Sequence, residues 1–104
     1  MVILNNGTYG MVRQFQQSYF EGRYQSTVWG FSAPDFAAVA RAFKIPACTV
    51  KEASEIESAL IQMWDDPLSP FLFQISIDMG ANVYPKIAFG HPFTEMESFQ
   101  NPQG

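Results

Sequence analysis

Residues 2–15 read Val-Ile-Leu-Asn-Asn-Gly-Thr-Tyr-Gly-Met-Val-Arg-Gln-Phe, and this stretch decides the fold class. An apolar run over residues 2–4 stops at two asparagines and a glycine, which is typical of a buried strand that ends in a turn. The apolar residues that follow Gly10 repeat at helical spacing: Met11, Val12, Phe15 and Tyr19. The stretch therefore predicts a strand, a tight turn and a helix in direct succession.

Two further helices are predicted downstream of this stretch. Residues 20–31 mix glycine, aromatic and polar side chains and predict a long loop. The helix after the loop has Ser32 as its expected cap, Pro34 in its first turn and Asp35 near its positive end. The expected inner stripe of this helix is Phe36, Val39, Ala40 and Phe43. The other helix is predicted over residues 54–64, with four side chains facing inward: Ile56, Leu60, Met63 and Trp64.

Two more strands complete the pattern. Residues 47–50 predict a short strand, and residues 71–77 predict the strongest strand of the chain. The order strand, helix, helix, strand, helix, strand implies right-handed crossovers and a short, mostly parallel sheet covered by helices. The predicted class is therefore α/β, in three layers. From residue 79 onward prolines and glycines predict an irregular tail, in which residues 94–97 could form one helical turn.

Composition and charge exclude several kinds of partner. The net charge is −4 and the six basic residues form no patch, which disfavours nucleic acids and anionic membranes. No apolar run approaches the roughly 20 residues of a membrane span. The single cysteine, Cys48, allows no internal disulfide and fits a reducing cytoplasm. Ten Phe, four Tyr and two Trp are a heavy apolar load, so we expect part of it to pack outside the chain, in a homo-oligomer.

The turn over residues 5–10 is the main candidate site. Ligands of an open α/β sheet bind beyond the carboxyl ends of its strands. Asparagine and carbonyl oxygens suit Mg²⁺, and the N-terminus of the next helix offers N–H groups to an anion. The turn therefore has the parts for a Mg-bridged diphosphate, although it lacks an acidic ligand of its own. The alternative is that Asn-Asn-Gly is an ordinary turn, because both residue types tolerate positive φ.

Other residues give weaker signals. We expect His91 to be a surface residue and Cys48 to be an inert, buried thiol. Asp65 and Asp66 read as a helix end. The chain contains no Gly-x-Ser-x-Gly elbow and no Walker or Rossmann glycine loop.

The run from Val2 to Phe15 resembles the end of the motif that binds thiamine diphosphate (ThDP), which opens with Gly-Asp-Gly and closes with Asn-Asn after an apolar strand. Its Gly-Met-Val continuation, with Gln14 and an aromatic residue at 15, is similar to acetolactate synthase and its relatives. Weaker likeness continues at residues 34–36, 42–47, 70–72 and 84–86. The resemblance implies a partial three-layer α/β/α ThDP-binding fold, with the C-terminal part of that domain over residues 1–78 and a tail over 79–104.

The resemblance also implies roles for particular residues. Asn6 would bind Mg²⁺ through its side-chain oxygen and Thr8 through its backbone carbonyl, while Met11 would face cofactor and substrate. The remaining residues along the cofactor would be Gly7, Tyr9 and Gly10. Phe15 would line the substrate channel, where the synthases commonly carry tryptophan, so this departure puts strict acetolactate synthesis in doubt.

The resemblance further implies a larger parent protein. No Gly-Asp-Gly precedes Asn5 in this chain, and the glutamate that activates the cofactor lies in another domain of the family. We therefore expect the parent, with its N-terminal domains, to decarboxylate a 2-oxo acid and pass on the acyl group. The chain alone should be inactive, and no catalytic residue is assigned within it. The resemblance leaves FAD in the parent open, and the rival hypothesis is a free-standing α/β interaction or regulatory module without cofactor.

Overall fold

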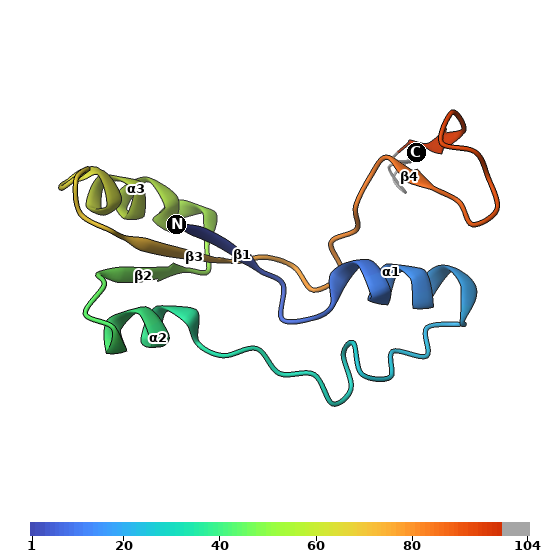
Figure 1. Cartoon of the computed structure of the whole chain (residues 1–104), viewed down its shortest axis with the longest axis horizontal. Coiled ribbons are helices and arrows are strands. Elements are labelled where there is room, and N and C mark those ends of the chain that lie inside the picture. Colours follow the sequence, from blue (N-terminus) through green and yellow to red (C-terminus); the bar gives the residue numbers. More distant parts are fainter. Residues whose placement is uncertain (99–104) are drawn as a thin grey trace.

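The computed structural model describes residues 1–98 (Figure 1). Helices and strands alternate in the predicted order strand, helix, helix, strand, helix, strand, and a two-stranded hairpin follows. The elements are β1 (Val2–Asn5), α1 (Gly10–Tyr19), α2 (Phe36–Ala42), β2 (Ala47–Val50), a short 3₁₀ turn η1 (Ala53–Glu55), α3 (Ile56–Trp64), β3 (Leu72–Ser76), β4 (Lys86–Ile87) and β5 (Met96–Glu97).

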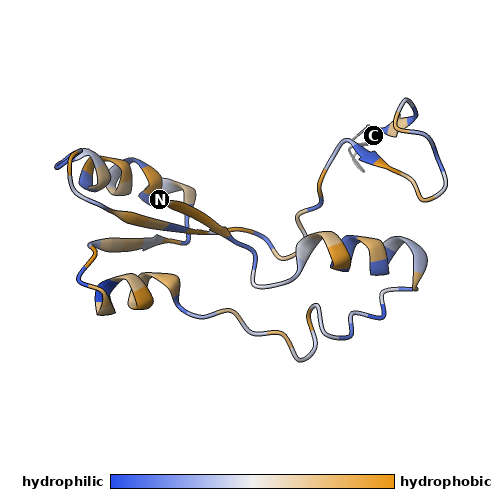
Figure 2. Cartoon of the chain, in the orientation of Figure 1, coloured by the Kyte–Doolittle hydropathy of each residue, from blue (hydrophilic) through white to orange (hydrophobic). Residues whose placement is uncertain are grey.

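The three long strands form one parallel sheet in the order β1-β3-β2. Val2 pairs with Phe73 on one side of β3, and Ala47 pairs with Leu72 on the other. Helices α2 and α3 lie on opposite faces of this sheet (Figure 1). Both β1 and β3 are hydrophobic along most of their length (Figure 2). The prediction of a three-layer α/β fold with a short parallel sheet is confirmed.

The core is small and lies between α3 and the sheet. Val50, Ala59 and Phe73 are its buried members, and Cys48, Met63, Phe71 and Ile75 pack against them. On the opposite face, Ala37 and Ala40 of α2 are buried against the sheet. The side-chain oxygen of buried Gln74 accepts a hydrogen bond from the Ala37 amide at 3.3 Å, so a polar contact joins β3 to the start of α2.

Two predictions about the helices are wrong in detail. Helix α2 begins at Phe36, and its cap is Asp35, whose Oδ1 accepts from the Ala38 amide at 2.9 Å. Ser32 and Pro34 precede the helix, because the first free amides lie within reach of Asp35 and not of Ser32. The inner face is also shifted, since small alanines allow α2 to approach the sheet closely. Phe43 is left 77% exposed, and Trp64 of α3 is 66% exposed.

Helix α1 and the tail form an arm beside the sheet (Figure 1). The principal extents of the molecule are 47 × 31 × 26 Å, and its radius of gyration is 17.2 Å. A compact chain of this length would have a radius of gyration of about 13 Å. The molecule is therefore elongated, and much of α1 has no contact with the sheet.

The tail is more regular than predicted. Residues 94–97 do not form a helical turn, because Met96 and Glu97 pair with Ile87 and Lys86 in an antiparallel ladder. Residues 99–104 of the predicted tail lie outside the described residues. Within residues 1–98, no helix has both the length and the apolar character needed to cross a bilayer.

Candidate functional site

The candidate turn lies where β1 ends, as predicted for a site on a parallel sheet. The Asn5 carbonyl accepts from the Ile77 amide at 3.0 Å, so the turn starts beside the end of β3. Asn5 Oδ1 accepts from the Gly7 amide at 2.9 Å, and Asn6 Oδ1 accepts from the Thr8 amide at 3.2 Å. Two successive side-chain turns thus shape the backbone. Gly7 has a φ of +62°, which glycine adopts without steric cost.

The loop between α1 and α2 holds the turn in place through hydrogen bonds. Thr8 is buried, and its hydroxyl donates to the carbonyl of Thr27. The Tyr9 amide donates to the same carbonyl at 3.2 Å. Thr27 is itself buried, and its hydroxyl hydrogen-bonds Gln16 of α1. Thr27 is therefore a supporting residue that the sequence reasoning missed, because the only signal was the length of the loop.

The N-terminus of α1 directly follows the turn. Tyr9 is the N-cap but makes no side-chain cap, and the first turn contains no acidic residue. Among the described residues, the amides of Gly10, Met11 and Val12 have no hydrogen-bond acceptor, whereas the Arg13 amide donates to Tyr9. Free amides at a helix N-terminus attract an anion, because the helix dipole adds to their positive charge.

Two oxygen atoms of the turn, Asn6 Oδ1 and the Thr8 carbonyl, are of the kind that binds Mg²⁺. Asn6 Oδ1 uses one lone pair for the Thr8 amide and keeps another. The Thr8 carbonyl accepts no hydrogen bond from the described part of the chain. Mg²⁺ binds such oxygens together with carboxylates and substrate phosphates. Within residues 1–98 no group of three or more His, Cys, Asp or Glu side chains is placed to hold a metal. The two oxygen atoms of the turn are both neutral ligands.

Met11 and Phe15 lie on the exposed face of α1, and both line an open cavity of about 320 Å³. The opposite wall of the cavity comes from the tail and includes Val83, Pro85 and Ile87. Tyr19 also lines the cavity, and its ring centroid lies 4.7 Å from that of Phe15. The structure thus places the two predicted substrate-side residues, Met11 and Phe15, in one apolar cavity.

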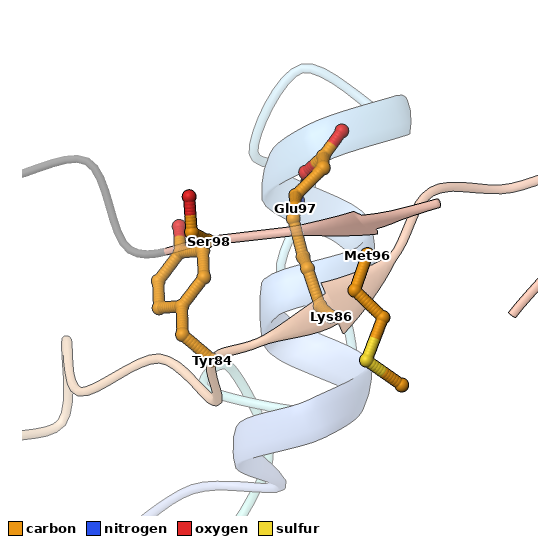
Figure 3. Close-up of a pocket in the computed structure, with 5 residues that line it drawn as sticks. All are labelled: Tyr84, Lys86, Met96, Glu97 and Ser98. Atoms are coloured by element: carbon orange, nitrogen blue, oxygen red, sulfur yellow. The ribbon is translucent and has the colours of Figure 1, made fainter. Parts of the chain in front are cut away.

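A second cavity, of about 510 Å³, lies on the hairpin (Figure 3). Its lining residues are Tyr84, Lys86, Met96, Glu97 and Ser98. Lys86 Nζ lies 3.3 Å from Glu97 Oε2 across β4 and β5. No residue of the 5–10 turn lines this cavity, so it is separate from the candidate cofactor site.

The weaker candidates have structural explanations. Cys48 is only partly buried, not fully buried as expected, because it packs at the border of the core. This partial burial raises the pKa of its thiol, which favours the unreactive protonated form. His91 is on the surface as predicted, with Nδ1 3.0 Å from Glu95 Oε2. Asp66 accepts from the Ser69 hydroxyl and the Leu68 amide, and these bonds lower the pKa of its carboxyl. Asp66 is thus a turn residue, as expected.

The fold is that of an α/β domain, with free backbone amides and oxygen atoms where β1 ends and α1 begins. The family "Thiamine pyrophosphate enzyme, C-terminal TPP binding domain" matches residues 1–74, and the chain belongs to this family. Thiamine pyrophosphate is another name for ThDP, so the family resemblance seen in the sequence is confirmed.

Relatives of the chain carry a more specific name. It is 36% identical over 103 residues to the acetolactate synthase large subunit of Pyropia yezoensis, covering 99% of the chain and 17% of that subunit. It is 38% identical over 96 residues to the acetolactate synthase isozyme 2 large subunit of Escherichia coli K12, covering 92% of the chain and 17% of that subunit. Acetolactate synthase 2 of Zea mays is 33% identical over 100 residues. The chain thus spans about a sixth of the length of these relatives.

Proposed function

We propose that this chain supplies one side of the Mg-ThDP site of a larger, acetolactate-synthase-like enzyme that acts on 2-oxo acids. One observation carries the proposal. The side-chain oxygen of Asn6, the free carbonyl of Thr8 and the free amides of residues 10–12 all belong to one turn and the helix that follows it. The relatives, which are acetolactate synthases by name, support the reaction class.

In this proposal the turn holds the diphosphate end of the cofactor. Asn6 Oδ1 and the Thr8 carbonyl would bind Mg²⁺, and the amides of Gly10 and Met11 would balance the phosphate charge. Gly7 and Tyr9 would lie along the diphosphate. The buried contacts of Thr8 and Tyr9 with Thr27 keep the carbonyl of Thr8 in place before the cofactor binds.

The cofactor, once bound, supplies the chemistry that decarboxylates a 2-oxo acid and transfers the remaining acyl group. The residues of this chain contribute orientation and charge balance. The acidic Mg²⁺ ligand and the glutamate that activates the cofactor would come from other parts of the parent protein. For that reason we propose that the isolated chain has no activity.

The proposed substrate side is apolar. Met11 and Phe15 line the cavity, and Lys86 is the one charged residue that lines it among residues 1–98. Phenylalanine at position 15 has less surface than the tryptophan that the synthases commonly carry. This difference changes the wall of the substrate cavity, so position 15 bears on which acceptor the parent protein uses. Carboligation and simple decarboxylation are therefore both included in the proposed reaction class.

Substitution of Asn6 in the full-length protein tests the proposal. Asn6→Ala removes the side-chain ligand, whereas Asn6→Asp keeps an oxygen at the same place and serves as the matched control. We expect Asn6→Ala to weaken ThDP binding in the presence of Mg²⁺ by at least about tenfold, by titration calorimetry, and Asn6→Asp to retain it. Unchanged binding in Asn6→Ala would refute the role of Asn6. A full-length protein that binds no ThDP would favour the interaction module instead.

A further inference from the structure

The two buried residues of α1 are polar and both face the tail. Arg13 is only 5% exposed and Gln14 only 7%, while the apolar residues Met11 and Val12 of the same helix are exposed. This arrangement reverses the usual order of an amphipathic helix, in which the apolar stripe is covered. The tail segment 80–83 is what covers Arg13 and Gln14.

Arg13 binds this segment with its guanidinium. One terminal nitrogen donates to Gly80 O at 3.2 Å and to Ala81 O at 3.3 Å, and also contacts Asn82 Oδ1. The other donates to Gln17 Oε1 at 3.0 Å. No carboxylate lies within ion-pair distance of Arg13 in the described residues, and its buried Nε has no acceptor. A buried cation needs such acceptors to offset its lost hydration, so the guanidinium depends on the carbonyls of the tail.

Gln14 binds Val83, the next residue of the tail, as both donor and acceptor. Its Nε2 donates to Val83 O at 3.1 Å, and its Oε1 accepts from the Val83 amide at 2.9 Å. The carboxamide thus pairs with the backbone of the tail as a neighbouring strand would. These hydrogen bonds form a seam between α1 and the tail. Further along α1, two exposed hydrogen bonds extend this seam: Lys86 Nζ to Ser18 Oγ at 3.2 Å and the Phe89 amide to Tyr19 OH at 2.7 Å.

The held segment leads directly into the wall of the apolar cavity. Val83, Pro85 and Ile87 line it opposite Met11 and Phe15, and Gln14 itself lies at its edge. We propose that Arg13 and Gln14 are positioning residues that fix residues 80–83 on α1 and thereby hold the tail as one wall of this cavity. The anchoring of the tail is independent of the cofactor, whereas its consequence for substrate access rests on the proposed function.

Hydrogen exchange in the full-length protein tests the anchoring. Arg13→Ala and Gln14→Leu should each speed exchange of the Val83 amide and its neighbours in the tail by about tenfold, because buried hydrogen bonds that hold the segment are lost. Amides of β1 and β3 should exchange as in the wild type. Arg23→Ala is the matched control, since Arg23 is an exposed arginine outside the seam, and it should leave the tail unchanged.

Two milder variants serve if Arg13→Ala does not fold. Gln14→Glu can still accept from the Val83 amide but cannot donate to its carbonyl, and Arg13→Lys lacks the planar fork. Each should give a smaller increase confined to the tail. Exchange of the tail that stays at the wild-type rate in all four variants would overturn the proposal, and so would an increase that is equally large in the sheet.

Kinetics of the same variants test the consequence for substrate. We expect the KM for a 2-oxo acid to rise at least about threefold while the affinity for Mg-ThDP stays unchanged, since the tail borders the cavity and not the turn. An unchanged KM in variants whose tail exchanges faster would overturn the link to substrate access. A wild-type protein that binds no ThDP would refute the proposed function instead, and the exchange rates would still decide the anchoring.

Discussion

At the scale of single residues, the conformation of Asn6 depends on the absence of a side chain at Gly10. A Cβ atom at position 10 would lie 2.5 Å from Asn6 Nδ2, which is too close for any real contact. The clashing atom is the end of a flexible side chain, so the fold can survive while the Asn6 carboxamide turns away. Gly7 differs, because a Cβ there would meet nothing within 4 Å but the backbone has positive φ.

Alanine at these two positions should have different effects, on cofactor binding at Gly10 and on stability at Gly7. In the full-length protein, Gly10→Ala should weaken Mg-ThDP binding about tenfold without loss of thermal stability, since alanine favours the helix by up to about 1 kcal/mol. Gly7→Ala should cost about 1 kcal/mol of stability through backbone strain. Titration calorimetry and thermal melts measure both quantities. Wild-type affinity in Gly10→Ala would contradict a role for the Asn6 side chain in the cofactor site.

The sequence predicted the residues of the turn but not their support. Asn6, Thr8 and Gly10 follow from the strand-turn-helix pattern and the family motif. The burial of Arg13 and Gln14 does not, because helical periodicity assigns polar residues to solvent. Only the tail, which returns from residue 80 to cover α1, makes that burial favourable, and such a long-range contact leaves no local pattern.

At the scale of elements, Glu55 joins η1 to the start of α3. Its Oε2 accepts from the Lys51 amide at 2.8 Å and the Glu52 amide at 3.0 Å. These backbone bonds, the Lys51 bond first, hold the pKa of the Glu55 carboxyl below its ordinary value of 4.5. Because the folded-state pKa is lowered, this carboxyl stabilises the fold above its ordinary pKa, and the stabilisation is lost as pH falls through the lowered value.

Glu55→Gln should therefore flatten the loss of stability in acid. We expect the unfolding free energy of the full-length protein to fall less steeply below about pH 4.5 in Glu55→Gln than in the wild type. Part of the slope should remain, because the Ser69 hydroxyl also lowers the pKa of Asp66. Glu57→Gln is the control, since the Glu57 side chain makes no hydrogen bond or ion pair within residues 1–98. Denaturant titrations between pH 3 and 7 measure the effect. Parallel curves for Glu55→Gln and the wild type would contradict the role given to the two hydrogen bonds of Glu55.

The elements were predictable, but their inner faces were only partly so. The strands at 47–50 and 71–77 and the helix near 54–64 occur within a residue or two of the expected bounds. Periodicity shows which side chains share a face, but it does not show which face meets the sheet. Ala37 is fully buried and Phe43 is exposed because small residues let α2 lie close to the sheet. The two-residue strands β4 and β5 are too short to show any period.

At the scale of the whole molecule, the chain leaves an unusually large surface open. Its accessible surface is 7916 Å², whereas a compact monomer of 11.7 kDa would expose about 5,900 Å². Large apolar side chains contribute to this surface, among them Trp29, Phe43, Phe89 and Phe93. The aromatic content of the sequence had suggested packing outside the chain. The excess of about 2,000 Å² on this one chain is larger than the roughly 800 Å² that each partner contributes to a standard protein interface.

The open surface predicts association. We expect the full-length protein to be a homo-oligomer, and we expect the isolated chain also to associate through its exposed apolar surface. Light scattering across micromolar concentrations measures both. Phe43→Ser, at the C-terminal end of α2, and Trp64→Ser, at the last residue of α3, should reduce association of the isolated chain, because both side chains are exposed. A strictly monomeric full-length protein would contradict this prediction.

The position of Mg²⁺ and ThDP in a crystal structure of the full-length protein tests the central proposal most directly. We expect Asn6 Oδ1 and the Thr8 carbonyl to lie about 2.0–2.1 Å from Mg²⁺, with the diphosphate against the amides at the start of α1. A cofactor whose metal is bound elsewhere, with the 5–10 turn free of contact, would contradict the assignment of this turn as one side of the site.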